Sequence, residues 1–318
     1  MISRRVLLLG IAALGAPRAS SGQTPVGVAR VLVYTGSMAW RDGIAGGLRD
    51  LGWIEGQNVV VEWRHREPLE DATVVEELGG LHPDVAVLGG PLRIRRAMKV
   101  AKSIPLVGID LESDPVASGF VKSLARPGAN ISGIWLDLPE LAGKQLQFLQ
   151  ELAPALVRVG VVWDDQIGGP QFAETQSAAR IINVKLVAVS LRRAAEADGT
   201  MTRLFAQSPQ AVVVLTSPAI FQALPRIAEL ARQKHLPSIS PFSTYPASGG
   251  LMAYGPSFPA LWRQAAGYVD RILKGAKVGD LAIERPSRFE LIINLKTAKA
   301  LGLTIPHSLL LRADEIIQ

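Results

Sequence analysis

Two hydrophobic patterns recur along the chain. Short apolar runs are typical of buried strands, and apolar residues three and four positions apart are typical of helices. Short apolar runs rich in β-branched residues occur in the first half at 30–34, 58–63, 84–88 and 105–109. Between them, apolar residues recur three and four positions apart over 40–51, 69–81 and 93–102. This alternation predicts β-α-β units whose strands form a mostly parallel sheet.

The same pattern returns in the second half of the chain. Strands are predicted at 157–163, 184–189, 211–215 and 237–239. Helices are predicted at 140–152, 172–182, 195–206 and 221–235. The tail adds two strands and two helices, at 250–254, 259–273, 289–294 and 295–301. We therefore predict an α/β protein with two doubly wound parallel-sheet lobes, joined near residues 133–139, and a tail that returns between them.

The N-terminus has a pattern of its own. Arg4 and Arg5 precede an apolar run over 6–16, and small residues follow at 19–22. This order is typical of a secretory signal, which we expect to occupy residues 1–22 and to be cleaved. A membrane anchor is the alternative, but the run is shorter than the roughly 20 residues that a span needs. The arginine pair leaves the general and the twin-arginine export routes open.

Composition narrows the function classes. The chain contains no cysteine, which excludes disulfides, thiolate zinc sites and cysteine nucleophiles. The formal charge of +6 falls to +3 without residues 1–22, because three arginines and no acidic residue leave with them. This mild charge comes from scattered basic residues, so we expect no nucleic-acid partner.

Motifs for catalysis are absent from the sequence. It has no phosphate-binding or dinucleotide-binding glycine loop, no G-x-S-x-G elbow and no H-E-x-x-H. Asp164 and Asp165 form a carboxylate pair after a strand and could bind a metal or act as acid and base. Neighbouring residues there point apart, however, which disfavours a shared site. We expect neither an enzyme nor a bound cofactor or metal.

Ligands of open parallel sheets bind outside the carboxyl ends of the strands. The residues at these ends include small residues, hydroxyls, carboxylates and aromatic rings, as expected for an apolar pocket with a few orienting polar groups. The candidate ligand-binding residues are Ser37, Trp40, Gly89, Gly90, Pro91, Asp110, Asp114, Asp164, Thr216, Ser217, Pro218, Phe242, Tyr245 and Tyr254.

Several of these candidates have a purely structural alternative. Trp40, Phe242 and the two tyrosines could be core aromatics. Asp114 before a proline could initiate a turn, and Ser217 could be the N-cap of the following helix. The Gly89-Gly90-Pro91 corner is hypothesised to form part of the cleft floor, where glycine lets a ligand approach backbone N–H groups. On that hypothesis, Gly90→Val weakens binding and leaves the fold intact.

Several segments of the chain resemble a known family. They include LGWIEGQNV at 51–59, DPV at 114–116, SLARPGANISG at 123–133, PELAGK at 139–144, GGLMAYGP at 249–256, YVDRILKG at 268–275 and FELIINLKTAKALGL at 289–303. In their order and their residues these segments resemble the ABC transporter substrate-binding proteins of the tryptophan/tyrosine-type uptake family. The match covers essentially all of the mature chain.

The resemblance implies a type I periplasmic-binding-protein fold with two lobes, a central cleft and three hinge crossings. Lobe 1 would comprise 26–137 and 256–285, and lobe 2 would comprise 138–255 and 286–318. The crossings would lie near 134–138, 254–257 and 284–288. The implied protein is a periplasmic, monomeric receptor that binds a small-molecule solute and delivers it to ABC permease membrane subunits.

Some relatives bind aromatic amino acids, so an aromatic amino acid or aromatic acid is one expected solute. The chain departs from the family at two places in the pocket. It has Gly89-Gly90 where members commonly have threonine or serine, and Asp164 where they commonly have asparagine. Two alternatives to transport were weighed. A periplasmic ligand sensor domain feeding a signalling partner stays open, whereas a secreted enzyme would need a catalytic constellation.

Overall fold

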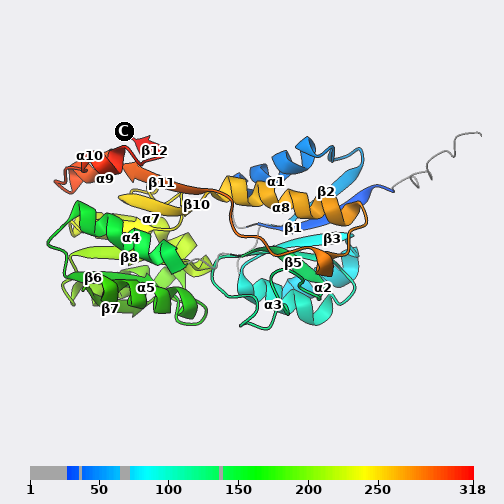
Figure 1. The fold of residues 1–318 in the computed structure, drawn as a ribbon, viewed down its shortest axis with the longest axis horizontal. Helices are drawn as coiled ribbons and strands as arrows, with labels where there is room; N and C mark the ends of the chain where they lie inside the picture. Colours follow the sequence, from blue (N-terminus) through cyan, green and yellow to red (C-terminus); the bar gives the residue numbers. More distant parts are fainter. Residues whose placement is uncertain (1–26, 36–37, 65–71, 136–138) are drawn as a thin grey trace, which may run out of the picture.

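The computed structural model describes residues 27–35, 38–64, 72–135 and 139–318. The segment interpreted as a signal, the candidate Ser37 and part of the first expected crossing lie outside the described residues. Two lobes lie side by side along the longest axis of the molecule (Figure 1).

Lobe 1 is built on a parallel sheet in the order β2-β1-β3-β4-β5. The strands are β1 (Ala29–Tyr34), β2 (Val59–Arg64), β3 (Val85–Gly89), β4 (Leu106–Asp110) and β5 (Ile131–Trp135). Its helices are α1 (Met38–Asp50), α2 (Ala72–Leu81), α3 (Pro91–Val100) and α8 (Phe258–Leu273). Because side chains alternate along a strand, Val31 and Val33 pack toward α1 and α8, and Leu32 and Tyr34 toward α2 and α3.

Lobe 2 is built on a second sheet in the order β12-β11-β10-β9-β8-β6-β7. The strands are β6 (Arg158–Trp163), β7 (Lys185–Ser190), β8 (Ala211–Val214), β9 (Ser238–Ser240), β10 (Met252–Pro256), β11 (Phe289–Asn294) and β12 (Glu315–Ile317). The helices are α4 (Pro139–Leu152), α5 (Gly169–Ile181), α6 (Ala197–Phe205), α7 (Pro218–Gln233), α9 (Leu295–Ala300) and α10 (His307–Leu310). Short 3-10 turns occur at Ala194–Glu196 and Val278–Asp280. All pairs are parallel except β10 with β11.

The periodicity analysis did not predict β5, β12 or α10. β5 lies where a boundary was expected, because Gly133 interrupts its apolar run and weakens the strand signal. β10 begins later than predicted, since Gly249 has a φ of +97° and the N–H of Gly250 bonds to the carbonyl of Tyr245 at 3.0 Å, which closes a turn.

The crossings between the lobes are hydrogen-bonded to one another. The Ser257 N–H donates to the Arg288 carbonyl at 3.0 Å, directly beyond the β10–β11 pair. The Trp135 N–H donates to the Glu284 carbonyl, also at 3.0 Å. The chain thus leaves lobe 2 after β10, adds α8 to lobe 1 and returns along β11 (Figure 1).

Two glycines bring α1 and α8 unusually close. A Cβ on Gly43 would lie 2.6 Å from the Pro259 carbonyl oxygen, and one on Gly47 would lie 2.8 Å from the Ala266 Cβ. Real Cβ atoms do not approach so closely, so larger residues at these positions would push the helices apart. The close contact fixes the start of α8, which carries Phe258 and Trp262, beside the start of α1, which carries Trp40.

Candidate ligand-binding site between the lobes

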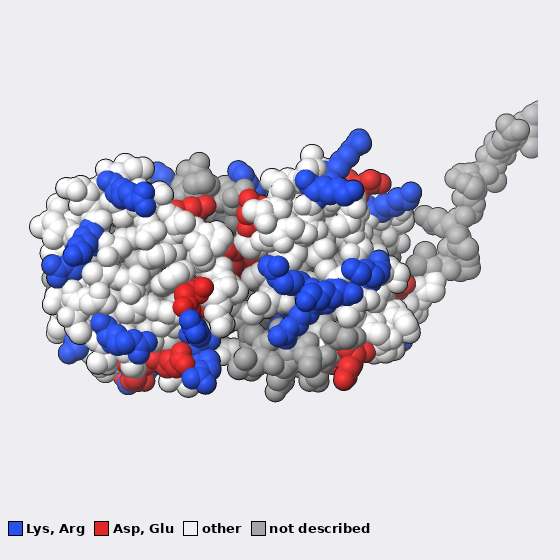
Figure 2. Space-filling view, turned by 90° about the horizontal axis from the view of Figure 1, so that it is seen from below, with Lys and Arg blue, Asp and Glu red and all other residues white. Residues whose placement is uncertain are grey.

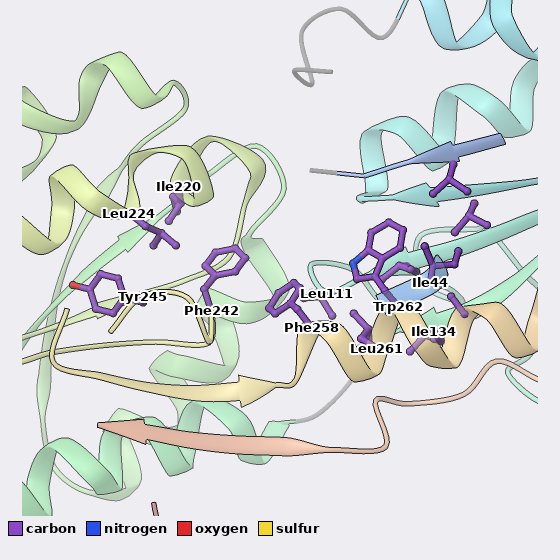
Figure 3. Packing of buried hydrophobic residues seen from close by; sticks show 14 of the residues in the cluster. Ile44, Leu111, Ile134, Ile220, Leu224, Phe242, Tyr245, Phe258, Leu261 and Trp262 are labelled. Atoms are coloured by element: carbon purple, nitrogen blue, oxygen red, sulfur yellow. The ribbon is translucent and has the colours of Figure 1, made fainter. Parts of the chain in front are cut away.

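Five aromatic side chains from both lobes meet at the boundary, and we call them the interlobe aromatic cluster. Trp40, Phe258 and Trp262 belong to helices of lobe 1, and Phe221 and Phe242 belong to lobe 2. Figure 3 shows Phe242 and Phe258 facing each other from the two lobes. A single group of buried apolar residues continues through this contact from one lobe into the other.

The rings of this cluster form both stacked and tilted pairs. The Trp40 ring is stacked on Phe258 at 4.9 Å and on Trp262 at 5.8 Å between centroids. Phe221 approaches Trp40 at 4.8 Å in a tilted arrangement, and Phe242 lies 5.5 Å from Phe258. These separations are typical of favourable aromatic pairs. The boundary therefore presents flat apolar faces from both lobes.

Two hydrogen-bond donors in this cluster have no partner among the described residues. They are the indole Nε1 atoms of Trp40 and Trp262, both buried. Trp262 is only 1% exposed, and its nitrogen lies on the edge of the ring nearer to Phe258 and Leu111 (Figure 3). A buried N–H without an acceptor is unfavourable. An acceptor atom of a ligand would remove that cost.

The Gly89-Gly90-Pro91 corner lies against this cluster. A Cβ on Gly89 would be 3.6 Å from the Trp262 ring, so the small residue is in direct contact with the indole. Gly90 has a φ of +84° and its N–H donates to the Ile109 carbonyl at 2.8 Å, while Pro91 begins α3. The N–H of Gly90 is therefore used within the fold. The expectation that Gly90→Val leaves the fold intact was wrong, because a β-branched residue is strained at this φ.

Asp110 ends β4 in a fully buried acidic pair with Glu112, which the sequence analysis did not single out. The Asp110 carboxylate accepts hydrogen bonds from the N–H groups of Glu112 and Ser113, at 2.8 and 3.2 Å, and from the Ser113 hydroxyl. Burial raises the pKa of Asp110. Burial and the neighbouring Asp110 charge raise the pKa of Glu112 well above its ordinary value.

Asp114 lies one turn further along this loop. Its Oδ1 accepts the N–H groups of Val116 and Ala117 at 2.7 and 3.0 Å. This is the turn-initiating role that the sequence offered as the alternative to ligand contact. The structure shows the turn and does not test the ligand contact.

In lobe 2, Asp164 and Asp165 point apart, as expected. Asp164 is 5% exposed, accepts the Gln166 N–H at 3.0 Å and is hydrogen-bonded to the Ser217 hydroxyl, while burial raises its pKa. Asp165 instead forms a bidentate ion pair with Arg192, whose Nε and Nη2 donate to its two carboxylate oxygens at 2.7 and 2.6 Å. This ion pair lowers the pKa of Asp165. Within the described residues, no group of three or more histidines and carboxylates is placed to hold a metal ion.

The end of β8 is also tied into the fold. The Thr216 N–H donates to Gln171 Oε1 at 3.2 Å, and Gln171 Nε2 donates to the Thr216 hydroxyl at 2.5 Å. Ser217 is the N-cap of α7, accepting the Ile220 N–H at 3.1 Å, and Pro218 is the first helical residue. Gln171, which the sequence analysis did not single out, also lines a small interlobe pocket of about 20 Å³ with Leu111 from lobe 1.

Tyr245 and Tyr254 lie outside the interlobe aromatic cluster. Tyr245 is completely buried and donates its hydroxyl to the Ser238 hydroxyl at 2.8 Å. Tyr254 packs against Phe148 at 5.0 Å and Phe289 at 6.3 Å. Their predicted contacts with a ligand remain predictions. Phe221, Phe258 and Trp262 belong to the interlobe aromatic cluster but were not predicted as candidates. Phe258 and Trp262 follow a crossing and are four residues apart, and this spacing could have indicated them from the sequence.

The model of the family described as "ABC transporter substrate binding protein" matches residues 25–317. The chain belongs to this family. A tyrosine-binding protein of Clostridioides difficile is 23% identical over 291 residues, covering 89% of this chain and 82% of the relative. Members of the family are binding proteins that work outside the cytoplasm, so the chain is a small-molecule-binding protein and not an enzyme.

Solved structures confirm the two-lobed type I periplasmic-binding-protein fold. A conserved domain protein of Vibrio cholerae has a TM-score of 0.84 and 25% identity, covering 91% of this chain and 99% of that one. An ABC domain in complex with L-Trp from Streptococcus pneumonia has a TM-score of 0.83 and 21% identity, covering 92% and 100%. Among the described residues of this chain, no helix is long and apolar enough to cross a membrane.

Proposed function

We propose that this protein is the periplasmic receptor of an ABC importer and that its solute carries a planar aromatic group. The interlobe aromatic cluster is the observation that carries this proposal. Trp40 and Phe258 from lobe 1 and Phe221 and Phe242 from lobe 2 offer ring faces from both sides of the boundary. Once the lobes separate and these rings part, a flat apolar solute between them would gain stacking contacts from both lobes at once.

The two unpartnered indole N–H groups add a second requirement. A carboxylate or carbonyl oxygen of the solute would accept from Trp40 or Trp262. An aromatic amino acid or aromatic acid meets both requirements. The tyrosine-binding relative and the L-Trp complex support the same class of solute.

Delivery to permease subunits would follow from closure of the lobes about the crossings at 134–138, 254–257 and 284–288. The hydrogen bonds between the crossings, Ser257 to Arg288 and Trp135 to Glu284, support a shared hinge. The packing of α8 on α1 supports placing 256–285 in lobe 1 with 26–137, and 286–318 in lobe 2 with 138–255. The proposal also includes export of the protein with cleavage of a signal at 1–22, and function as a monomer.

Native mass spectrometry of the purified protein, followed by calorimetry with L-Trp, L-Tyr, L-Phe and indole acids, tests the solute class. Phe221→Leu should weaken binding of an aromatic solute by about two- to tenfold, because one ring contact is worth roughly 0.5–1.5 kcal/mol. The matched control is Phe205→Leu, at the end of α6, where the ring contacts Lys234 instead.

An aliphatic or sugar solute bound with higher affinity than every aromatic compound would contradict the aromatic class and leave the receptor assignment standing. Equal losses in Phe221→Leu and Phe205→Leu would show that the cluster does not line the binding site.

A further inference from the structure

Helix α3 presents an outward face with an unusual composition. Its exposed residues are Leu92, Arg95, Arg96, Lys99 and Val100, which recur at helical spacing. The two aliphatic residues at the ends of this face, Leu92 and Val100, are 40% and 45% exposed. We call these five residues the α3 face. It is a row of positive charges with an aliphatic side chain at each end.

The segment that carries the α3 face is itself strongly basic. Residues 91–102 contain three arginines and two lysines and no aspartate or glutamate. The Arg95 guanidinium lies 5.1 Å from the centre of the Phe120 ring, which holds its position. In Figure 2 a group of blue side chains gathers on lobe 1, on the side where Figure 1 places α3. Basic residues are scattered over the chain as a whole, but this segment is an exception, and the helix places Arg95, Arg96 and Lys99 on its exposed side.

We propose that the α3 face binds the surface of an anionic phospholipid bilayer. Arginine and lysine pair with lipid phosphates, and each cation near such a surface adds to the attraction. Leu92 and Val100 would enter the boundary between head groups and acyl chains, as the apolar side chains of interfacial helices do. This surface is separate from the interlobe aromatic cluster, and the binding does not depend on which solute the cleft takes.

The composition of the face favours lipid over an acidic protein partner. Protein interfaces are enriched in aromatic residues, methionine and arginine and depleted in lysine, so the two arginines alone would suit either partner. The α3 face has no aromatic residue, and its centre is Arg95, Arg96 and Lys99. A fluid layer of phosphates adapts to such a row of like charges without needing a fixed set of partners.

The position of the α3 face would set the orientation of the protein on the membrane. α3 begins at the Gly89-Gly90 corner, which contacts Trp262 of the interlobe aromatic cluster. The crossings through β10 and β11 lie toward the opposite edge of the molecule in Figure 1. A protein bound through the α3 face would therefore lie with α3 toward the bilayer and with these crossings away from it. It would then diffuse in two dimensions while it searches for a membrane partner.

Co-sedimentation of the full chain with phosphatidylglycerol/phosphatidylcholine vesicles and with phosphatidylcholine vesicles tests this proposal. The test variant is Arg95→Gln/Arg96→Gln/Lys99→Gln. The matched control, Arg180→Gln/Arg232→Gln/Lys299→Gln, removes the same charges from exposed sites on three helices of lobe 2. All variants carry the same N-terminal residues, so a difference between them reports on the α3 face alone.

We expect the test variant to partition about 100-fold more weakly to the anionic vesicles, because about three membrane-bound charges are lost. The control should partition less than about fivefold more weakly, which is a third of that effect in free energy. Raising salt from about 0.1 M to about 1 M should abolish the difference, because the Debye length shrinks from ~10 Å to ~3 Å. Leu92→Ser/Val100→Ser should weaken binding at both salt concentrations.

Equal losses in the test and control variants would overturn the proposal, since net charge alone would then explain the binding. So would equal partitioning of the unmodified chain to the two kinds of vesicle. Circular dichroism and thermal melting of each variant verify that a loss of binding does not come from unfolding.

Discussion

The two lobes build their sides of the boundary in different ways. In lobe 2 the polar side chains at the strand ends are bonded to the fold itself, Thr216 to Gln171 and Ser217 to the first turn of α7. In lobe 1 the indole N–H groups of Trp40 and Trp262 have no acceptor among the described residues. On the proposed function, lobe 2 would supply a pre-organised wall, whereas lobe 1 would supply the N–H donors that bind acceptor atoms of the ligand.

The largest effect should come from truncating the lobe 1 wall. Trp262→Ala removes a buried indole that contacts Gly89 and stacks on Trp40, and should lower the free energy of unfolding by about 3–5 kcal/mol. Trp262→Phe keeps most of the volume and removes the unpartnered N–H, so it should cost less than about 1.5 kcal/mol. Urea denaturation measures both. A phenylalanine variant as unstable as the alanine variant would show that the indole N–H has a partner after all.

A smaller effect should come from the lobe 2 wall. Ser217→Ala removes the N-cap of α7 and the hydroxyl that bonds to Asp164, and should cost about 1 kcal/mol of stability. Ser217→Asn, which can still cap the helix, is the matched control and should stay close to the unmodified chain. If both substitutions destabilise equally, the hydroxyl's contact with Asp164 matters more than the cap.

The smallest expected change is in pH dependence. Because the pKa of Glu112 is raised in the folded chain, its contribution to stability is fully present below its unfolded value of 4.5 and is lost as the pH rises through the folded value. Glu112→Gln keeps a donor to Asp110 and removes this loss, so its stability relative to the unmodified chain should rise with pH. Denaturation at several pH values checks this, with the exposed Glu76→Gln as control. A constant difference across the range would contradict a raised pKa of Glu112.

The sequence predicted most of the fold and part of the site. Continuous apolar runs such as that of β1 and helical spacing such as that of α8 are local signals, because a strand covered by helices buries both faces and a helix on the sheet buries one. Trp40 and Phe242 were predicted as candidates because they lie at strand ends. Phe221 was not, since its role depends on the lobe that faces it, and β5 was not, since Gly133 interrupts its pattern.

By itself, the sequence determined the alternation of strands and helices, the division into two similar halves and the family, because burial periodicity and characteristic segments are written along the chain. Only the tertiary structure decided that rings from α1, α7, the β9 end and α8 form one cluster. It alone showed Glu112 beside Asp110 in a buried pair and placed Arg95, Arg96 and Lys99 on one exposed side of α3. The cluster depends on distances between residues far apart in the sequence, which are set by the packing of whole elements. The acidic pair depends on the conformation of a loop, and the α3 face depends on orientation about a helix.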